Sequence, residues 1–297
     1  MRYLPRVLLL NLLAIMLMGA PTLFAEDKLS DLQRIDAAWQ NYVRELTRSG
    51  DLIRDQAFSN SVINRFEGYR SVMAIAAVNY ANLLFPDRNT PEYIPDFGPL
   101  VNYCAPAPSY KYGMFHLDPA GTYRVRGFRG DAELIDFQQQ AGWYGENEGE
   151  NQIITKVNIT FDKIDTGVGK DGYYDFILSN KEQSGRWWKL EEDVNALFIR
   201  EFYVDFDTHP RSATFHIDRI DAPEKKTTSV SEVDEAVFRL EAMARAQDYL
   251  NLCLRMGNAF PEGDNMVREE RYDQGGGQID QRYFQARYNV KQDEALI

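Results

Sequence analysis

A short cluster of acidic and imidazole side chains is formed by Asp205, Asp207 and His209, which alternate along the chain. Oxygen and nitrogen donors at this spacing could hold a divalent cation, and an Asp–His pair could act in general acid–base catalysis. Pro210 follows at once, so the same residues would also suit a solvated acidic turn. With only three histidines in the chain, we expect no histidine-rich zinc site. The prediction is therefore a weak catalytic candidate, no metal site and no cofactor.

Arginines at three positions could bind an anionic ligand. Arg124 and Arg126 are two residues apart in a predicted strand, so their side chains share a face. Two guanidinium groups could bind a carboxylate or sulfate, although cross-strand ion pairs with Asp or Glu would explain them equally. Arg200 alternates with Phe198 and Phe202. A cation on such an apolar face must either close an ion pair or line a pocket.

Aromatic residues are abundant near the predicted turns, and the pair Trp143-Tyr144 is the one we select as a candidate for ligand binding. Aromatic rings at the loop ends of a sandwich can stack on sugars, although many of them are expected in the core. We name Trp143 and Tyr144, together with Arg124, Arg126 and Arg200, as candidate ligand-binding residues.

Motifs for covalent catalysis or phosphate binding are weak. The sequence contains no Gly-x-Ser-x-Gly elbow, and Cys104 has no base beside it. The glycine-rich segment 167–172 lacks the Ser or Thr that follows the lysine of a phosphate loop, and it predicts a hairpin turn. No covalent nucleophile is indicated.

The candidate residues lie in a region whose hydrophobicity alternates with period two, which predicts strands. Seven short strands without intervening helices favour an antiparallel β-sandwich of the jelly-roll type over a parallel sheet. The predicted strands are Thr122–Gly127, Ala132–Gln138, Gln152–Asp162, Tyr173–Leu178, Trp187–Leu190, Ala196–Phe206 and Ala213–Ile220.

Helical periodicity flanks this region on both sides. Residues 27–49 predict an amphipathic helix, and 61–85 are apolar over most of their surface, which predicts a buried helix. Val233–Met256 predicts a further helix toward the C-terminus. The expected organisation is an α+β chain with a helical unit at 26–90, a loop rich in proline and aromatics at 91–113, a β-sandwich at 114–222, and a linker, helix and start of a further β region at 223–297.

The first 25 residues have the order of a secretory signal peptide. Arg2 and Arg6 precede the apolar stretch Val7–Met18, and Ala25 precedes an acidic pair. The apolar stretch is too short to span a bilayer, which takes about 20 residues. The sequence therefore predicts an exported protein, periplasmic or extracellular, without a stable membrane span after cleavage. An uncleaved anchor is the alternative.

The charge of the chain argues against nucleic-acid binding. The formal charge is −12, and removal of Arg2 and Arg6 with the signal peptide would make it −14. Phosphate contacts need clustered Lys and Arg, so nucleic acid is not an expected partner. Cys104 and Cys253 could pair in an oxidising compartment, although Cys253 in an apolar helix would also suit a buried thiol.

Four segments resemble a known family, namely Asp118–Asp131, Asp171–Ser179, Gly185–Leu190 and Leu197–Asp207. They are similar to the family around the domain of unknown function numbered 1214. The resemblance implies a jelly-roll β-sandwich with helical extensions, and it carries no agreed activity. Tyr283–Ile297 resembles the entry to a second β region in longer members, which implies a C-terminally truncated chain.

Three functions follow as hypotheses. The first is a binding module, in which the loops at 102–112 and 142–150 present aromatics and acids to a glycan or small polar ligand. The second is a hydrolase or lyase that acts on such a ligand through Asp205 and Asp207. The third is an envelope scaffold that acts through protein contacts, with an oligomeric state that the sequence leaves open.

Overall fold

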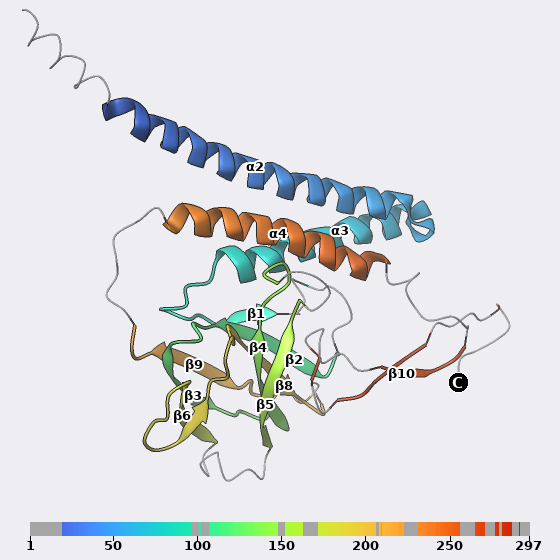
Figure 1. The fold of residues 1–297 in the computed structure, drawn as a ribbon. Helices are drawn as coiled ribbons and strands as arrows, with labels where there is room; N and C mark the ends of the chain where they lie inside the picture. Colours follow the sequence, from blue (N-terminus) through green and yellow to red (C-terminus); the bar gives the residue numbers. More distant parts are fainter. Residues whose placement is uncertain are drawn as a thin grey trace, which may run out of the picture.

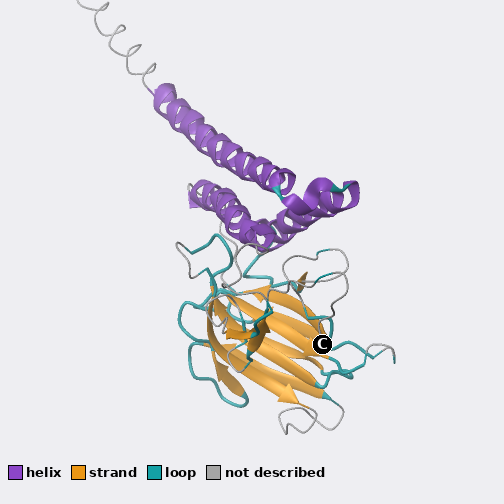
Figure 2. Ribbon diagram, turned by 90° about the vertical axis from the view of Figure 1, so that its right-hand side faces the viewer, coloured by secondary structure: helices purple, strands orange, loops and turns teal. Residues whose placement is uncertain are grey.

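The computed structural model shows a layer of helices lying across one side of a two-sheet β structure (Figures 1 and 2). It describes residues 20–96, 101, 107–147, 152–162, 172–205, 208, 210–222, 231–255, 265–270, 277–278, 281–286 and 291. Within these residues, no helix is long and apolar enough to cross a membrane. The α+β class and the antiparallel sheets predicted from the sequence are confirmed.

Three long helices make the helical layer. They are α2 (Ala20–Asp55), α3 (Val62–Asn79) and α4 (Ser231–Arg255), with the 3-10 turn η1 (Ala57–Asn60) before α3 and the π-helical turn η2 (Tyr80–Leu84) after it. Ser61 caps α3, because its hydroxyl accepts a hydrogen bond from the backbone N–H of Asn64.

The helix α2 packs along α4, and the two run in the same direction. Arg34 forms an ion pair with Asp234 at 2.5 Å, and Arg48 pairs with Asp248 at 2.8 Å. Inside the contact, the Ser49 hydroxyl is 2.7 Å from Asn251 Oδ1. The three contacts join N-terminal to C-terminal sequence, so the predicted helical units at the two ends of the chain form one layer.

Eleven described strands form three sheets. The five-stranded sheet has the order β1-β2-β8-β4-β5, the four-stranded sheet has the order β7-β6-β3-β9, and β10 pairs with β11. Pairing is antiparallel throughout, except that β6 and β7 run parallel. The strands are β1 (Ile94–Asp96), β2 (Tyr110–His116), β3 (Thr122–Phe128), β4 (Leu134–Ala141), β5 (Ile154–Asp162), β6 (Tyr173–Ser179), β7 (Trp187–Lys189), β8 (Ala196–Phe202), β9 (Thr214–Arg219), β10 (Arg268–Glu270) and β11 (Tyr283–Gln285).

Two hydrophobic cores hold the layers together. The first lies between the two large sheets, where Phe137 of β4 meets the rings of Tyr174 and Phe176 of β6 edge-on. The second lies between the outer face of the five-stranded sheet and the helices, and joins Phe198 of β8 to Ile75 of α3. Residues alternate between these cores along β8, because successive side chains of a strand point to opposite faces.

The seven strands predicted between 114 and 222 are all present, with small shifts at their ends. The expected loop at 91–113 was wrong in part, since β1 and most of β2 lie there. Pro95 sits in β1, which is an edge strand, and an edge is where a strand tolerates proline. The jelly-roll connectivity stays a prediction: β2, β3 and β4 alternate between the sheets, whereas β4 and β5 are neighbours in one sheet.

The expectation that residues 61–85 form a buried helix was wrong for one face. Val72, Ile75 and Val78 are buried, whereas Phe66 and Met73 are exposed. Both faces of α3 are apolar, and only one is covered by the rest of the chain.

Candidate ligand-binding site

The predicted pair Arg124 and Arg126 lies on the exposed face of β3, and both side chains are engaged in cross-strand ion pairs. Arg124 contacts both carboxylate oxygens of Asp175, at 2.5 and 3.0 Å. Arg126 is 2.7 Å from Asp218. The Arg124 guanidinium lowers the pKa of the Asp175 carboxyl. The ion-pair interpretation of this arginine pair therefore matches the structure.

Arg200 closes a buried ion pair on the outer face of the five-stranded sheet. Its guanidinium is 3.0 Å from Asp136 and 2.7 Å from the amide oxygen of Gln138, and it lies 4.6 Å above the Phe198 ring. Burial raises the pKa of Asp136, and the charge of Arg200 and its hydrogen bonds oppose that shift. Asn158 donates to both oxygens of the same carboxylate.

Trp143 and Tyr144 are core residues of the helix contact. Trp143 is buried and meets Tyr144 edge-on, and Tyr144 stacks on Tyr249 of α4 with ring centroids 5.4 Å apart. Their rings hold the β4–β5 turn against the helix. The proposal that they present aromatic faces to a glycan loses its support.

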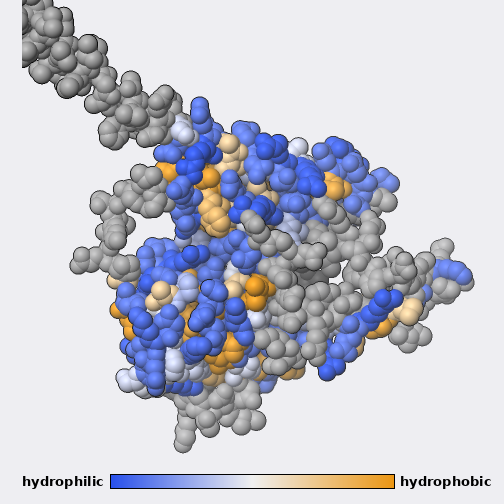
Figure 3. All heavy atoms as spheres, in the orientation of Figure 1, coloured by the Kyte–Doolittle hydropathy of each residue, from blue (hydrophilic) through white to orange (hydrophobic). Residues whose placement is uncertain are grey.

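Asp205 is exposed after the end of β8, and Asp207, His209 and Cys104 lie outside the described residues. Cys253 lies in α4, where its backbone alone is described. No group of three or more His, Cys, Asp or Glu that could hold a metal occurs among the described residues. Most of the described surface drawn in Figure 3 is hydrophilic, in keeping with the many surface ion pairs.

A different site lies at the junction of the helices and the sheet, where two hollows meet at His116 and Pro86. The larger, of about 170 Å³, is lined by Phe85, Pro86, Asp87, Thr90, Pro91, Glu92, Ile94 and His116. The smaller, of about 50 Å³, is lined by Asn82, Leu83, Pro86, Arg88, His116, Glu146, Glu235, Phe238 and Arg239. We call the two together the His116 pocket.

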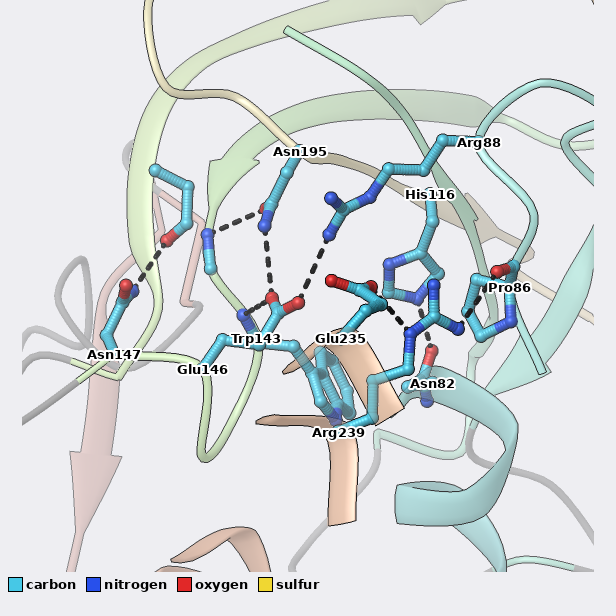
Figure 4. A network of polar contacts seen from close by, with 12 residues as sticks. Asn82, Pro86, Arg88, His116, Trp143, Glu146, Asn147, Asn195, Glu235 and Arg239 are labelled. Atoms are coloured by element: carbon cyan, nitrogen blue, oxygen red, sulfur yellow. Dashed lines mark hydrogen bonds and ion pairs between the residues drawn. The ribbon is translucent and has the colours of Figure 1, made fainter. Parts of the chain in front are cut away.

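Five segments of the chain supply the polar groups of the His116 pocket (Figure 4). The π-helical turn η2 supplies Asn82, the following loop supplies Arg88, the end of β2 supplies His116, the β4–β5 turn supplies Glu146, and α4 supplies Glu235 and Arg239. Short π-helical turns are rare and frequently occur at functional sites. The pocket thus depends on the correct docking of the helices onto the sheet.

His116 is buried in this pocket and its tautomer follows from its neighbour. Nε2 is 3.0 Å from Oδ1 of Asn82, while the amide nitrogen of Asn82 donates to the carbonyl of Val78. The amide oxygen therefore faces the ring, Nε2 carries the proton, and Nδ1 is left as an acceptor. Burial, reinforced by the charges of Arg88 and Arg239, lowers the pKa of His116 to about 3. The imidazole is neutral at physiological pH.

Two arginine–glutamate pairs stand beside the neutral ring. Arg88 is 3.3 Å from Glu146, and Arg239 is 2.7 Å from Glu235. Glu146 is held in place by the backbone N–H of Trp143 at 2.8 Å and by the side chain of Asn195 at 3.0 Å. In Figure 4 these side chains point toward one another.

The β4–β5 turn that carries Glu146 is fixed against α4 by a glycine. Gly145 has φ of +84°, and a Cβ there would overlap the carbonyl oxygen of Ala242. Arg245 donates from Nε to the Gly145 carbonyl at 2.7 Å. Only glycine lets the turn approach the helix backbone this closely.

Sequence reasoning missed the His116 pocket as a site. None of the expectations drawn from the sequence singles out His116, which is buried and has a hydrogen-bond partner in Asn82. No sequence pattern predicts the convergence of Asn82, Arg88, Glu146 and Arg239, because no two of these residues belong to one local motif.

Comparison with known proteins adds a likeness of fold. No family model matches the chain, and no curated protein gives a significant match. Among solved structures, a crystal structure of an uncharacterised protein from Burkholderia cenocepacia is similar, with a TM-score of 0.67 and 21% sequence identity over 84% of this chain and 68% of that chain. At this identity the likeness extends to the fold alone.

Proposed function

We propose that this chain is an exported binding protein for a small polar ligand with an anionic group, and that the His116 pocket holds the ligand. The observation that carries the proposal is a buried, uncharged imidazole beside two arginines, each of which is paired with a glutamate and keeps further N–H donors. A glycan could be bound through a terminal acidic sugar, because such a unit has the same combination of groups.

The donors of the pocket suit an anion. In the described structure Arg88 uses one terminal nitrogen for Glu146, and Arg239 uses Nε for Glu235 and one terminal nitrogen for the carbonyl of Pro86. A guanidinium has five N–H donors, so each arginine keeps further donors for a carboxylate or phosphate oxygen.

The acceptor of the pocket suits a hydroxyl or amine of the same ligand. With Nε2 bonded to Asn82, the His116 ring offers Nδ1, which can accept one hydrogen bond. A hydroxyl placed near a carboxylate, as in a hydroxy acid or a sugar acid, would satisfy both the ring and the arginines. The two arginines line the smaller hollow, of about 50 Å³, which has room for little more than a carboxylate. The rest of the ligand would occupy the larger hollow, which is below the 300–1,000 Å³ typical of drug-sized ligands, so the ligand is of about monosaccharide size or smaller.

Binding is better supported than catalysis. A general acid or base works best with a pKa near the working pH, and a His116 pKa of about 3 is far from that range. Asp205, Asp207 and His209 carried the alternative of a hydrolase or lyase, and the one described among them, Asp205, is exposed.

Export and family are part of the proposal. The order of Arg2, Arg6, the apolar stretch and Ala25 supports secretion to the periplasm or the extracellular space. Residues 118–131 and 171–179 support membership of the family around the domain of unknown function numbered 1214. The negative charge of the chain supports the absence of nucleic-acid partners.

A thermal-shift series on the chain from Glu26 onward tests the binding. A ligand that binds only the folded state stabilises it by RT ln(1 + [L]/Kd), about 2.7 kcal/mol at 100 times Kd. We expect lactate, glycerate, glucuronate or galacturonate to raise the Tm, and glucose and acetate to do so far less. The proposal fails if none of the hydroxy acids and sugar acids shifts the Tm at tens of millimolar.

A variant pair ties the shift to the pocket. Arg239→Gln should abolish the shift, because it removes a guanidinium that faces His116. Arg211→Gln is the matched control: Arg211 pairs with Asp131 near the far end of β3, away from His116. An equal loss in both variants would mean that the ligand binds elsewhere.

A further inference from the structure

One face of α3 is apolar and is not covered by any described part of the chain. Ile63 is 74% exposed, Phe66 and Met73 are each 63% exposed, and Tyr80 is 55% exposed. Together with Arg70 and Ala77, which are also exposed, they form one continuous line of side chains. We call these six residues the α3 seam.

The composition of α3 indicates that the α3 seam is normally covered. The opposite face of the helix already packs on the molecule through Gly68, Val72, Ile75 and Val78. A second line of large apolar side chains on the same helix is expected to be covered as well. The rest of the described chain covers only one of the two faces of α3.

The spacing of the seam is that of two packed helices. The residues recur at intervals of 3, 4, 3, 4 and 3, so that Phe66, Met73 and Tyr80 occupy one heptad position and Ile63, Arg70 and Ala77 the other. This interval keeps a narrow line of side chains facing a neighbouring helix over several turns.

We propose that the α3 seam is the interface of a two-fold symmetric homodimer, in which α3 packs antiparallel against the α3 of a second copy. In this register Phe66 faces the partner's Ala77, Ile63 faces the partner's Tyr80, and Arg70 faces the partner's Met73. Phe66 therefore meets a small residue and Arg70 meets a flexible one, and the same contacts recur on both sides of the axis, as an isologous interface requires.

The charges favour the antiparallel arrangement. A parallel pair would set Arg70 against the partner's Arg70, and like charges would face each other in an apolar seam. In the antiparallel pair, the aliphatic stem of Arg70 lies on Met73, and Glu67 of the same helix, 3.2 Å away, neutralises the guanidinium. One polar residue in such a seam fixes its register.

The exposed area is of the size that a dimer needs. With the flanking Val62 and Tyr69, the exposed parts of the large apolar residues sum to roughly 700 Å², the most that this surface could bury in a dimer, against about 800 Å² per partner in a standard interface. A membrane surface fits less well, because helices that lie on membranes carry many basic residues on the polar face, and this chain is strongly acidic.

Mass measurement over a range of concentrations tests the dimer. We expect the chain from Glu26 onward to sediment as a dimer at micromolar concentration, and Met73→Asp to weaken association at least 100-fold. Val204→Asp is the matched control, since Val204 is also an exposed apolar residue, 74% exposed, but lies after β8. Far-UV circular dichroism confirms that each variant is folded.

Two outcomes would overturn the dimer. One is a wild-type chain that stays monomeric up to about 100 µM. The other is a mutational pattern that does not single out the α3 seam. Either Met73→Asp leaves the association unchanged, or Val204→Asp weakens it as much as Met73→Asp does. Flotation with neutral phosphatidylcholine vesicles that is lost in Met73→Asp, with a monomer in solution, would assign the seam to a lipid surface instead.

Cross-linking tests the register separately. In a background with Cys104→Ser and Cys253→Ser, a mixture of Phe66→Cys and Ala77→Cys chains should form a disulfide-linked dimer under mild oxidation. Each variant alone should form at least ten times less. A Phe66→Cys chain that cross-links to itself as readily as the mixture would contradict the antiparallel register.

Discussion

His116 shows how a single buried ring can acquire a fixed function from its surroundings. Asn82 selects the tautomer, and burial with two nearby arginines removes the charge. A neutral acceptor with a low pKa keeps its hydrogen-bonding character over the whole physiological range. This is a property of a recognition group, and it differs from that of a histidine that shuttles protons.

The neutrality of His116 has a consequence for stability. Between its ordinary pKa of 6.5 and the folded value of about 3, the unfolded chain binds a proton that the folded chain does not. The free energy of unfolding should therefore fall as the pH falls, by about 1.4 kcal/mol per pH unit below 6. Urea titrations at pH 7, 6 and 5 measure the slope.

His116→Gln should remove most of that slope, because glutamine does not titrate. His216→Gln is the control, since His216 lies on the exposed side of β9. If the wild type and His116→Gln lose stability in parallel from pH 7 to 5, the ring is not held neutral by the fold.

The Arg200–Asp136 pair makes a second prediction at the scale of residues. Arg200→Met should lower the free energy of unfolding by about 3–5 kcal/mol, because it leaves the Asp136 carboxylate buried without its cation. The double variant Arg200→Met with Asp136→Leu should recover most of that loss. Equilibrium urea unfolding measures both, with Arg124→Met, which breaks an exposed pair, as a control of small effect.

Residue types alone predicted part of this picture. Both possible roles of Arg124, Arg126 and Arg200 were visible in the sequence, because strand alternation places a side chain on a face. The choice between pocket and ion pair depended on Asp175, Asp218 and Asp136, and cross-strand register is not encoded in either strand by itself. Trp143 and Tyr144 were ambiguous for the same reason, since α4 buries them from 100 residues further along the chain.

At the scale of elements, the β4–β5 turn lies directly against the backbone of α4 at Gly145. Gly145→Ala should cost about 3 kcal/mol or more, because the added methyl group must push α4 away in addition to straining the backbone. Gly185→Ala is a matched control: its φ is also +84°, and nothing lies within 4 Å of the added atom. It should cost about 1 kcal/mol.

Thermal and urea unfolding of the two variants measures the difference. Equal costs for Gly145→Ala and Gly185→Ala would show that the turn does not press on α4. A larger cost at Gly145 should be accompanied by weaker binding of any ligand of the His116 pocket, because Glu146 follows in the same turn.

Elements were predicted better than their partners. Periodicity found the seven later strands and the three long helices, because hydrophobic spacing reports which face of an element is covered. It missed β1 and β2, where proline and polar residues obscure the alternation. It also took the apolar surface of α3 as a sign of burial within the chain, and spacing cannot say whether the cover comes from the same chain.

At the scale of the whole molecule, the helices and the two large sheets are not independent domains. The second core contains Tyr42 of α2, Ile75 of α3, Leu250 of α4 and Met114 of β2. The predicted boundaries near 90, 113 and 222 therefore separate segments of sequence that share one hydrophobic core.

A single unfolding transition should follow from this shared core. Far-UV circular dichroism reports mainly on the helices, and tryptophan fluorescence reports on both cores through Trp143 and Trp188, with Trp39 of α2 and Trp187 of β7 contributing. The two signals should change at the same urea concentration. Loss of the helical signal at a lower urea concentration would show that the helical layer unfolds by itself.

The π-helical turn between α3 and β1 has a consequence beyond local geometry. Tyr80 at its start is the last residue of the α3 seam, and Asn82, two residues later, holds the His116 ring. A ligand in the His116 pocket and a second copy on the α3 seam would thus both contact the turn Tyr80–Leu84. By thermodynamic reciprocity, any factor by which the ligand tightens or loosens dimerisation must equal the factor by which dimerisation changes ligand affinity. If the π-helical turn couples the two events, ligand binding changes the fraction of the protein that is dimeric, and a mass measurement with and without ligand detects that change.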